Sequence, residues 1–249
     1  MNTNSSCARP LRNPMNRTVY PILLMVCTTH LLNDMMQSVI PAVYPLLKEK
    51  FGFTFAQIGV ITLVFQMTSS LLQPFAGRLA DRHPRPYSLA VGMCFTLAGL
   101  LALSVAPGFV FILAAVGLIG CGSSVFHPES SRVAQLASGG RKGLAQSIFQ
   151  VGGNAGSAMG PLLAALIVIP FGQASIGWFA LAALLAIFIL VQTAAGRSGT
   201  QDRRNGGGAG SRTYEAKNPG RAHYPGRIGI FEIFLHRLYD QLFHVLFDG

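Results

Sequence analysis

The chain has 249 residues, of which 51% are hydrophobic and only 11% are charged, and its mean hydropathy is +0.45. A soluble domain carries about a quarter charged residues, so this composition excludes an ordinary soluble protein and indicates a membrane protein. The formal net charge is +10, but no nucleic-acid-binding motif accompanies it. We therefore expect the basic residues to face anionic lipid headgroups and expect no nucleic-acid partner.

Six apolar stretches are each long enough to cross a bilayer, which takes about 20 helical residues. Lipid offers no water to unpaired backbone groups, so runs of this length predict helices. The stretches are 19–47, 54–75, 87–106, 109–131, 143–169 and 174–195. We predict an all-α membrane protein with a six-transmembrane-helix bundle at 19–196, preceded by a cytoplasmic N-terminal segment at 1–18.

Lysine and arginine residues are unevenly distributed between the loops. Arginines cluster before the first stretch, after the second and after the fourth, whereas the alternate loops carry only Lys48 and Lys50. Cytoplasmic loops are richer in these residues. Both termini are therefore predicted to be cytoplasmic.

The sequence changes character after residue 196. Residues 197–227 are rich in Gly and Arg, which favours disorder. Residues 228–249 carry apolar side chains at helical spacing and predict an amphipathic interfacial helix. A frameshift-derived tail is the open alternative, because codons exist for 230–248 that encode a membrane-helix-like string when they are read one nucleotide later.

A compact charged segment, GRLADRHPR, begins at residue 77 and follows the second stretch. A glycine permits close helix approach or a tight turn, and an aspartate can accept hydrogen bonds from a helix N-terminus while pairing with arginine. We predict a cytoplasmic loop that acts as a conformational gate. The alternative is a loop that only marks the cytoplasmic side. The gate residues are Gly77, Arg78, Asp81, Arg82 and Arg85.

The fifth stretch contains GGNAGSAMGP, with small residues at four-residue spacing. Such spacing lets helix backbones touch, and a proline frees a backbone carbonyl and bends the helix. We predict a helix-packing motif formed by Gly152, Gly156, Gly160 and Pro161.

The string HLLND places His30 and Asp34 one helical turn apart in the first stretch. A charge is costly in the bilayer, so we expect Asp34 to face the interior of the bundle. Burial favours the neutral carboxyl group, whereas a protonated His30 favours the carboxylate. This competition suits a proton-coupling group; a purely structural, hydrogen-bonded aspartate is the alternative.

In the fourth stretch, the string HPES supplies His127 and Glu129 as further proton-coupling candidates at its cytosolic end. Glu129 pairing with Arg132 is the equally weighted alternative. With no second histidine or cysteine nearby, HPES predicts no metal site. The four cysteines show no metal-ligand or disulfide spacing, and no motif calls for a cofactor or an enzymatic reaction.

Polar side chains recur at near-helical spacing in the apolar stretches. They can line a cavity or form hydrogen bonds between helices. The cavity-lining candidates are Asn33, Gln66, Gln73, Gln146, Gln150 and Asn154.

Together, HLLND with IPAVYPLLK, the ADRHPRP loop, and the segment from GSSVFHPES to QVGGNAG resemble the fosmidomycin-resistance-type branch of the major facilitator superfamily over about residues 20–195. The fourth stretch lacks the membrane arginine usual in drug/proton antiporters of this superfamily, and Ala164 stands where the helix-5 motif usually ends in glycine.

The resemblance implies a bacterial inner-membrane carrier that exports a small-molecule drug by proton antiport, in a family of twelve helices arranged as two six-helix halves. This sequence resembles the first half, so the implied partners are the bilayer, substrate, protons, and a second six-helix half or a second copy. The alternatives are an inactive membrane fragment of a disrupted transporter gene and a proton-coupled metabolite carrier half.

Overall fold

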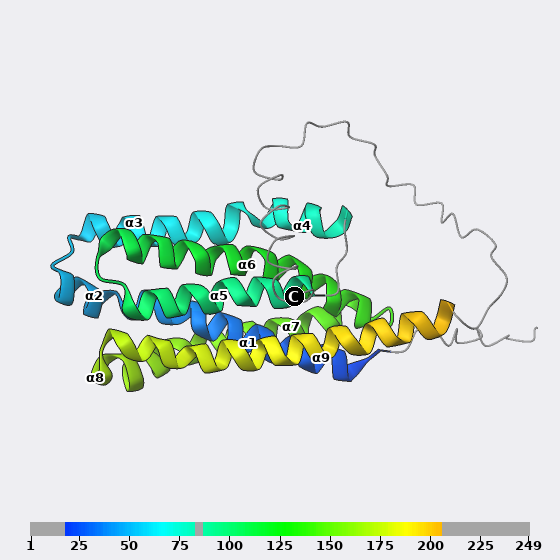
Figure 1. Ribbon diagram of the computed structural model, residues 1–249. Helices are drawn as coiled ribbons and strands as arrows, with labels where there is room; N and C mark the ends of the chain where they lie inside the picture. The colour runs from blue at the N-terminus through cyan, green and yellow to red at the C-terminus, as the bar shows by residue number, and fades with distance from the viewer. Residues whose placement is uncertain (1–17, 83–86, 206–249) are drawn as a thin grey trace, which may run out of the picture.

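The computed structural model describes residues 18–82 and 87–205, and the side chains within 18–79 and 87–194. These described residues are helical and contain no strand. Their long helices run side by side to form one bundle (Figure 1). The helices are α1 Tyr20–Ala42, α2 Tyr44–Phe51, α3 Phe55–Gln66, α4 Gln73–Arg82, α5 Ser88–Val105, α6 Phe109–Ala137, α7 Lys142–Leu163, α8 Ile169–Phe171 and α9 Phe179–Asn205.

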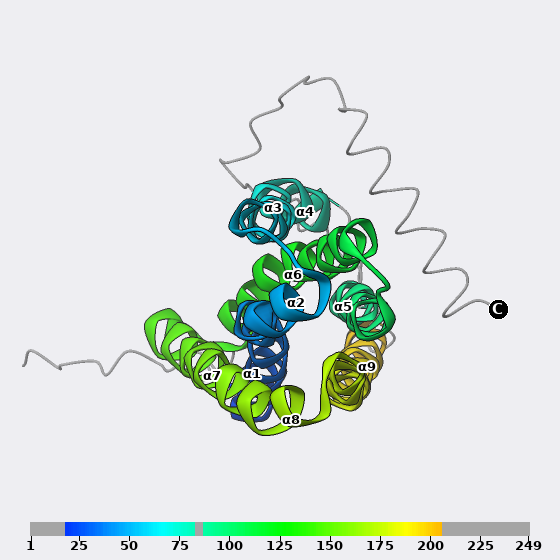
Figure 2. The same ribbon diagram turned by 90° about the vertical axis from the view of Figure 1, so that its left-hand side faces the viewer.

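Five of the described helical segments are long and apolar enough to cross a membrane. They are Phe55–Leu79, Ser88–Val105, Phe109–Ala137, Lys142–Phe171 and Gln173–Ala194. The sixth long helix is α1, whose 23 residues match the thickness of a bilayer. It lies between α6, α7 and α9 when the bundle is viewed end-on (Figure 2). The all-α, six-helix bundle predicted from the sequence is therefore confirmed.

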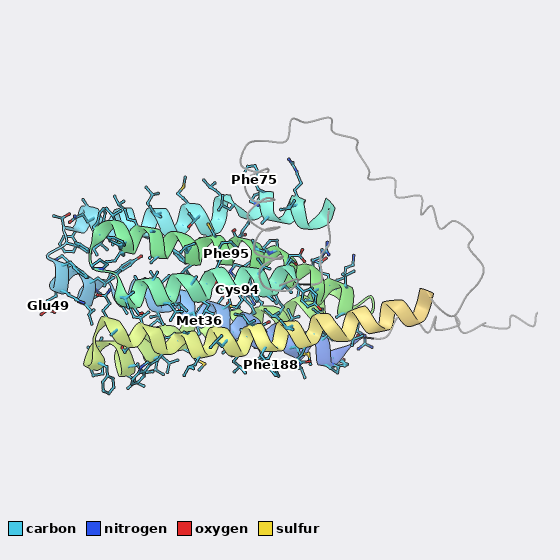
Figure 3. All side chains as sticks on the ribbon, viewed as in Figure 1. Met36, Glu49, Phe75, Cys94, Phe95 and Phe188 are labelled. Atoms are coloured by element: carbon cyan, nitrogen blue, oxygen red, sulfur yellow. The ribbon has the colours of Figure 1, made fainter. Side chains whose placement is uncertain are left out.

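The outer surface of the bundle is apolar. The side chains of Phe75 and Phe188 point away from the helices, whereas Met36 lies inside (Figure 3). Phe188 is 61% exposed and Met36 is 0% exposed. Apolar side chains on both faces of a helix are typical of a chain whose outer solvent is lipid.

Two long helices change their winding midway. The segments η1 (Met67–Leu71) and η2 (Ala164–Val168) are π-helical. The second follows Pro161, which lies inside α7 and has no amide hydrogen to donate. A local π-helical segment is one way in which a helix accommodates such a break, and here the chain continues as α8 without leaving the membrane-length segment.

Gln173, in the 3₁₀ segment η3 (Gln173–Trp178), forms hydrogen bonds to other segments at one end of the bundle. Its buried Nε2 donates hydrogen bonds to the backbone oxygens of Leu103 (2.7 Å) and Ala106 (3.0 Å), and its Oε1 accepts one from Lys50 Nζ (2.7 Å). These bonds connect α2, the end of α5 and the segment η3, which precedes α9.

The loop predicted to begin at residue 77 is helical in its first part, so that part of the prediction is wrong. Gly77 and Arg78 lie within α4, which continues through Asp81 to Arg82. The segment GRLADR consists mostly of good helix formers, so the helix continues beyond the last residues of the apolar stretch. Pro84 and Pro86 come directly afterwards, and the residue before a proline disfavours helix.

Several predicted segments lie wholly or partly outside the described residues. These are 1–18, except for its last residue, the tail at 228–249 and Arg85. Of the segment 197–227, the first part belongs to α9, which continues to Asn205 instead of ending at 196.

Candidate functional site

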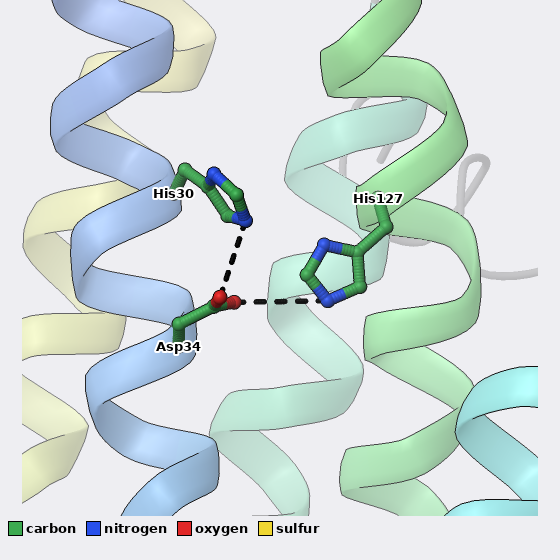
Figure 4. Close-up of side chains that lie close together, drawn as sticks. All are labelled: His30, Asp34 and His127. Atoms are coloured by element: carbon green, nitrogen blue, oxygen red, sulfur yellow. Dashed lines mark ion pairs between the residues drawn. The ribbon is translucent and has the colours of Figure 1, made fainter. Parts of the chain in front are cut away.

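Three titratable side chains meet inside the bundle. His30 and Asp34 come from α1, and His127 comes from α6 (Figure 4). Asp34 Oδ2 lies 3.2 Å from His30 Nε2, and Asp34 Oδ1 lies 3.6 Å from His127 Nε2. One carboxyl group therefore bridges two imidazoles on different helices.

His127 is not at the end of its helix, where the sequence placed it. The helix α6 continues past His127 to Ala137, and the imidazole of His127 lies beside the carboxyl group of Asp34. The two histidine rings form an edge-to-face pair with 5.3 Å between centroids.

The orientation of His30 is set by α7. Its ring stacks on the ring of Phe149 with 3.9 Å between centroids, and its Nδ1 lies 2.8 Å from the backbone oxygen of Phe149. A carbonyl oxygen can only accept, so Nδ1 carries the hydrogen and donates it. In neutral His30, Nε2 then presents a lone pair to Asp34.

The orientation of His30 determines whether its contact with Asp34 is attractive or repulsive. A lone pair on Nε2 and a carboxylate oxygen repel each other at 3.2 Å, so the contact between His30 and Asp34 is attractive only when a proton lies between them. The proton can belong to an imidazolium or to a carboxylic acid. A shared proton would therefore stabilise the contact between the two side chains.

The cluster is closed on one side and open on the other. The side chain of His30 is 4% exposed, whereas those of Asp34 and His127 are 18% and 26% exposed. Asp34 and His127 are therefore the partly exposed members of the cluster.

Two amide side chains on α1 flank the cluster. Asn33 Nδ2 donates to Asp34 Oδ1 (3.1 Å), and Gln37 Oε1 accepts a hydrogen bond from Ser123 Oγ of α6 (3.0 Å). Asn33 Oδ1 and Gln37 Nε2 are buried and have no hydrogen-bond partner among the described residues. Sequence reasoning missed Gln37, although it follows Asp34 by three residues and so lies on the same helix face.

Glu129 lies apart from this cluster. Arg132 Nε lies 3.8 Å from Glu129 Oε2, and the side chain of Glu129 is buried. Residues two apart in a helix do not share a face, so His127 and Glu129 point in different directions. The pairing of Glu129 with Arg132 is present, and the proton-coupling role of Glu129 stays a prediction.

The glycines of α7 lie against α1. A Cβ atom at Gly152 would meet the backbone oxygen of Cys27, one at Gly156 that of Leu31, and one at Gly160 the side chain of Ser38. Close backbone approach between two helices requires small residues at these positions. The packing brings α7 directly onto the helix that carries the cluster.

Gly153 has a different neighbour, the cluster itself. A Cβ atom there would lie against His30, 2.7 Å from Nε2, and 2.8 Å from Asp34 Oδ2. Real side chains do not approach so closely. The contact between His30 and Asp34 therefore uses space that only a glycine leaves open, which the sequence alone did not indicate.

The predicted cavity-lining residues outside α1 differ in their exposure and their hydrogen bonds. Gln146 accepts a hydrogen bond from Ser131 Oγ (3.2 Å) and so connects α7 to α6. Gln150 and Asn154 are exposed and bond to each other (3.4 Å). Gln66 is also exposed, and Gln73 is half-buried.

The predicted gate residues are described only in part. Gly77 faces α6, because a Cβ atom there would lie 3.6 Å from Pro128 Cβ. Arg78 is exposed. The side chains of Asp81 and Arg82, and all of Arg85, lie outside the described residues.

Potential metal ligands among the described residues form one cluster. His30, Asp34 and His127 each offer a ligand atom, and these atoms lie within 4.8 Å of one another. Cys27, Cys94 and Cys121 are free thiols.

An apolar-surfaced bundle of six long helices with a titratable centre defines a multi-pass membrane protein. The chain belongs to the Major Facilitator Superfamily, whose sequence model matches residues 26–247. The predicted family is therefore confirmed.

Two bacterial proteins are similar to the chain over most of its length. The fosmidomycin resistance protein of Escherichia coli (strain K12) is 61% identical over 176 residues, which are 71% of this chain and 43% of that protein. The uncharacterized MFS-type transporter YfnC of Bacillus subtilis (strain 168) is 48% identical over 192 residues, or 76% of this chain and 47% of that protein. The chain spans less than half the length of these relatives.

A more distant similarity extends to animals. Human protein spinster homolog 1 is 29% identical over 142 residues, which are 56% of this chain and 27% of that protein.

Proposed function

We propose that the chain is the N-terminal half of a proton-coupled carrier that exports a small drug of the fosmidomycin type across the bacterial inner membrane. The observation that carries the proposal is the 3.2 Å contact between His30 Nε2 and Asp34 Oδ2, which His127 joins from a second helix. The name of the 61% identical relative supports the substrate class.

The site couples protonation to helix position. When the shared proton leaves, the Asp34 carboxylate faces the lone pair of His30, and the repulsion favours separation of the two groups. His30 is held to α7 through Phe149, and Asp34 also contacts His127 of α6. Loss of the proton therefore strains contacts among three helices, and proton binding restores them.

The proposed carrier needs a second protein surface to cover the polar side chains on one side of the bundle. Gln150 and Asn154 are exposed on α7, and Gln66 is exposed on the segment that joins α3 to α4. Amide groups are costly in lipid and usually face protein or a wet cavity. We therefore propose that a second six-helix half, or a second copy of this chain, covers this side, with rocking of the halves providing alternating access.

Orientation follows from the arginine distribution. Both chain ends lie in the cytoplasm in this proposal, with α4 ending at the same side. The gate role of Gly77, Arg78, Asp81, Arg82 and Arg85 belongs to the same proposal, since the contact of Gly77 with α6 gives α4 a neighbour against which to slide.

A chain that is inactive on its own is the second candidate, since the residues in hand span 43% and 47% of the two bacterial relatives. A half-carrier for a proton-coupled metabolite is a third, because the 48% identical relative carries no substrate name.

Drug accumulation separates these candidates. Cells that produce the chain should accumulate less fosmidomycin than cells with an empty vector, and a proton uncoupler should abolish the difference. Asp34→Asn should abolish it as well, whereas Glu49→Gln, at an exposed position on α2, should not. Unchanged fosmidomycin accumulation despite confirmed membrane insertion would contradict export by this chain alone. A separately produced second half that restores export would then favour the half-carrier.

A further inference from the structure

We propose that His30, Asp34 and His127 form a binding site for a divalent transition-metal ion of the Zn²⁺ type. The proposal goes beyond the proposed export function and does not depend on it, because binding can be measured on a chain that transports nothing. The sequence predicted no metal site, because His127 is remote in sequence from the two α1 residues that it meets.

The spacing of the ligand atoms fits such an ion. Around a tetrahedral zinc ion with bonds of about 2.1 Å, neighbouring ligand atoms are about 3.4 Å apart. His30 Nε2 lies 3.2 Å from Asp34 Oδ2, and His127 Nε2 lies 3.6 Å from the other oxygen, Oδ1, so the carboxyl group would rotate to present one oxygen to the ion. All three ligand atoms lie within 4.8 Å of one another, so small side-chain movements complete the site.

The surroundings of His30 orient it as a ligand. Metal-binding histidines usually donate their other ring N–H to a carbonyl or a carboxylate, which fixes the ring and its tautomer. His30 does so through Nδ1 to the backbone oxygen of Phe149 (2.8 Å), and the stacked ring of Phe149 holds the imidazole plane. Its Nε2 is therefore already directed at Asp34 as an electron-pair donor.

The ligand set and the exposure select the class of ion. Two imidazole nitrogens and one carboxylate oxygen suit Zn²⁺, Co²⁺ or Ni²⁺ better than Mg²⁺ or Ca²⁺, which prefer oxygen ligands. The single negative charge of Asp34 offsets part of the charge of the ion. The partial exposure of Asp34 and His127 leaves room for a water molecule as fourth ligand.

A bound ion and the shared proton exclude each other. The metal takes the electron pairs of His30 Nε2 and Asp34, and the displaced proton passes to water. Zn²⁺ would therefore act as an inhibitor of a carrier that uses this proton.

Co²⁺ tests the site directly, since its visible absorption reports coordination. The purified full-length chain in detergent should give d–d bands that Zn²⁺ abolishes by competition. Asp34→Asn and His127→Ala should each weaken Co²⁺ binding about tenfold or more. His83→Ala, which removes a histidine outside the described residues, is the matched control and should leave the bands unchanged.

Two results would overturn the metal site. One is Co²⁺ binding that persists unchanged in both Asp34→Asn and His127→Ala. The other is binding that disappears in His83→Ala. Circular dichroism checks that each variant keeps its helix content, and His127→Gln replaces His127→Ala if the alanine variant unfolds.

Discussion

His30 is bound to Phe149 in two ways: its ring stacks on the phenyl ring at 3.9 Å between centroids, and its Nδ1 donates to the backbone oxygen of the same residue at 2.8 Å. The orientation of an imidazole on α1 is thus set by α7. Because the carbonyl accepts from Nδ1, Nε2 is the ring nitrogen that faces Asp34.

This tautomer can be observed by NMR. In a chain labelled with ¹⁵N-histidine, the resonances of neutral His30 should show a protonated Nδ1 and a bare Nε2. The His30→Gln variant assigns the signals. A neutral His30 with a bare Nδ1 would contradict the hydrogen bond to Phe149.

Gly153→Ala tests the space around the pair. The added methyl group would collide with both His30 and Asp34, so we expect loss of uncoupler-sensitive drug export and a shift of the His30 ¹⁵N resonances. Gly143→Ala is the matched control on the same helix, because a Cβ atom there meets nothing within 4 Å.

Comparison with Gly152→Ala separates packing from positioning. A Cβ atom at Gly152 would meet the backbone of Cys27 and not the cluster, so that variant should lower stability while the His30 signals stay close to their original positions. Equal ¹⁵N shifts in Gly152→Ala and Gly153→Ala would argue against a specific role for Gly153.

Gln173 should contribute to the stability of the bundle. Gln173→Ala leaves two buried carbonyl oxygens and Lys50 without this partner, and the free energy of unfolding should fall by about 2 kcal/mol. Unfolding by SDS titration measures the change. Gln135→Ala, at an exposed position on α6, should change it by less than about 0.5 kcal/mol.

Cysteine labelling tests the orientation in the membrane. In a background without the native cysteines, Gly108→Cys, between α5 and α6, should react with a membrane-impermeant maleimide in spheroplasts. Lys142→Cys, at the start of α7, should react only after the membrane is opened. The reverse pattern would place both termini outside the cytoplasm.

The membrane helices were predictable because length and hydropathy determine them. The residues at which these helices end were harder to predict. Hydropathy falls at Gly77, but α4 continues to Arg82 because GRLADR consists mostly of good helix formers before the prolines. The apolar pattern indicates where lipid contact ends, and helix propensity extends further.

The pairing of His30 with Asp34 could be predicted from the sequence, whereas the approach of His127 could not. His30 and Asp34 share a face because they are four residues apart, which HLLND alone indicates. The meeting with His127 depends on how α6 crosses α1, which no local pattern specifies. The role of Gly153 likewise depends on the close packing of α7 against α1, since one glycine in a glycine-rich run cannot be distinguished from its neighbours beforehand.

The central claim is that the proton shared by His30 and Asp34 is exchanged for drug, and proton flux in proteoliposomes tests it most directly. With the purified chain reconstituted around a pH-sensitive dye, an imposed fosmidomycin gradient should drive protons in the opposite direction, and Asp34→Asn should abolish this flux while Glu49→Gln preserves it. Equal proton flux through the original chain and Asp34→Asn would contradict the claim, and the absence of flux in both would contradict transport by this chain alone.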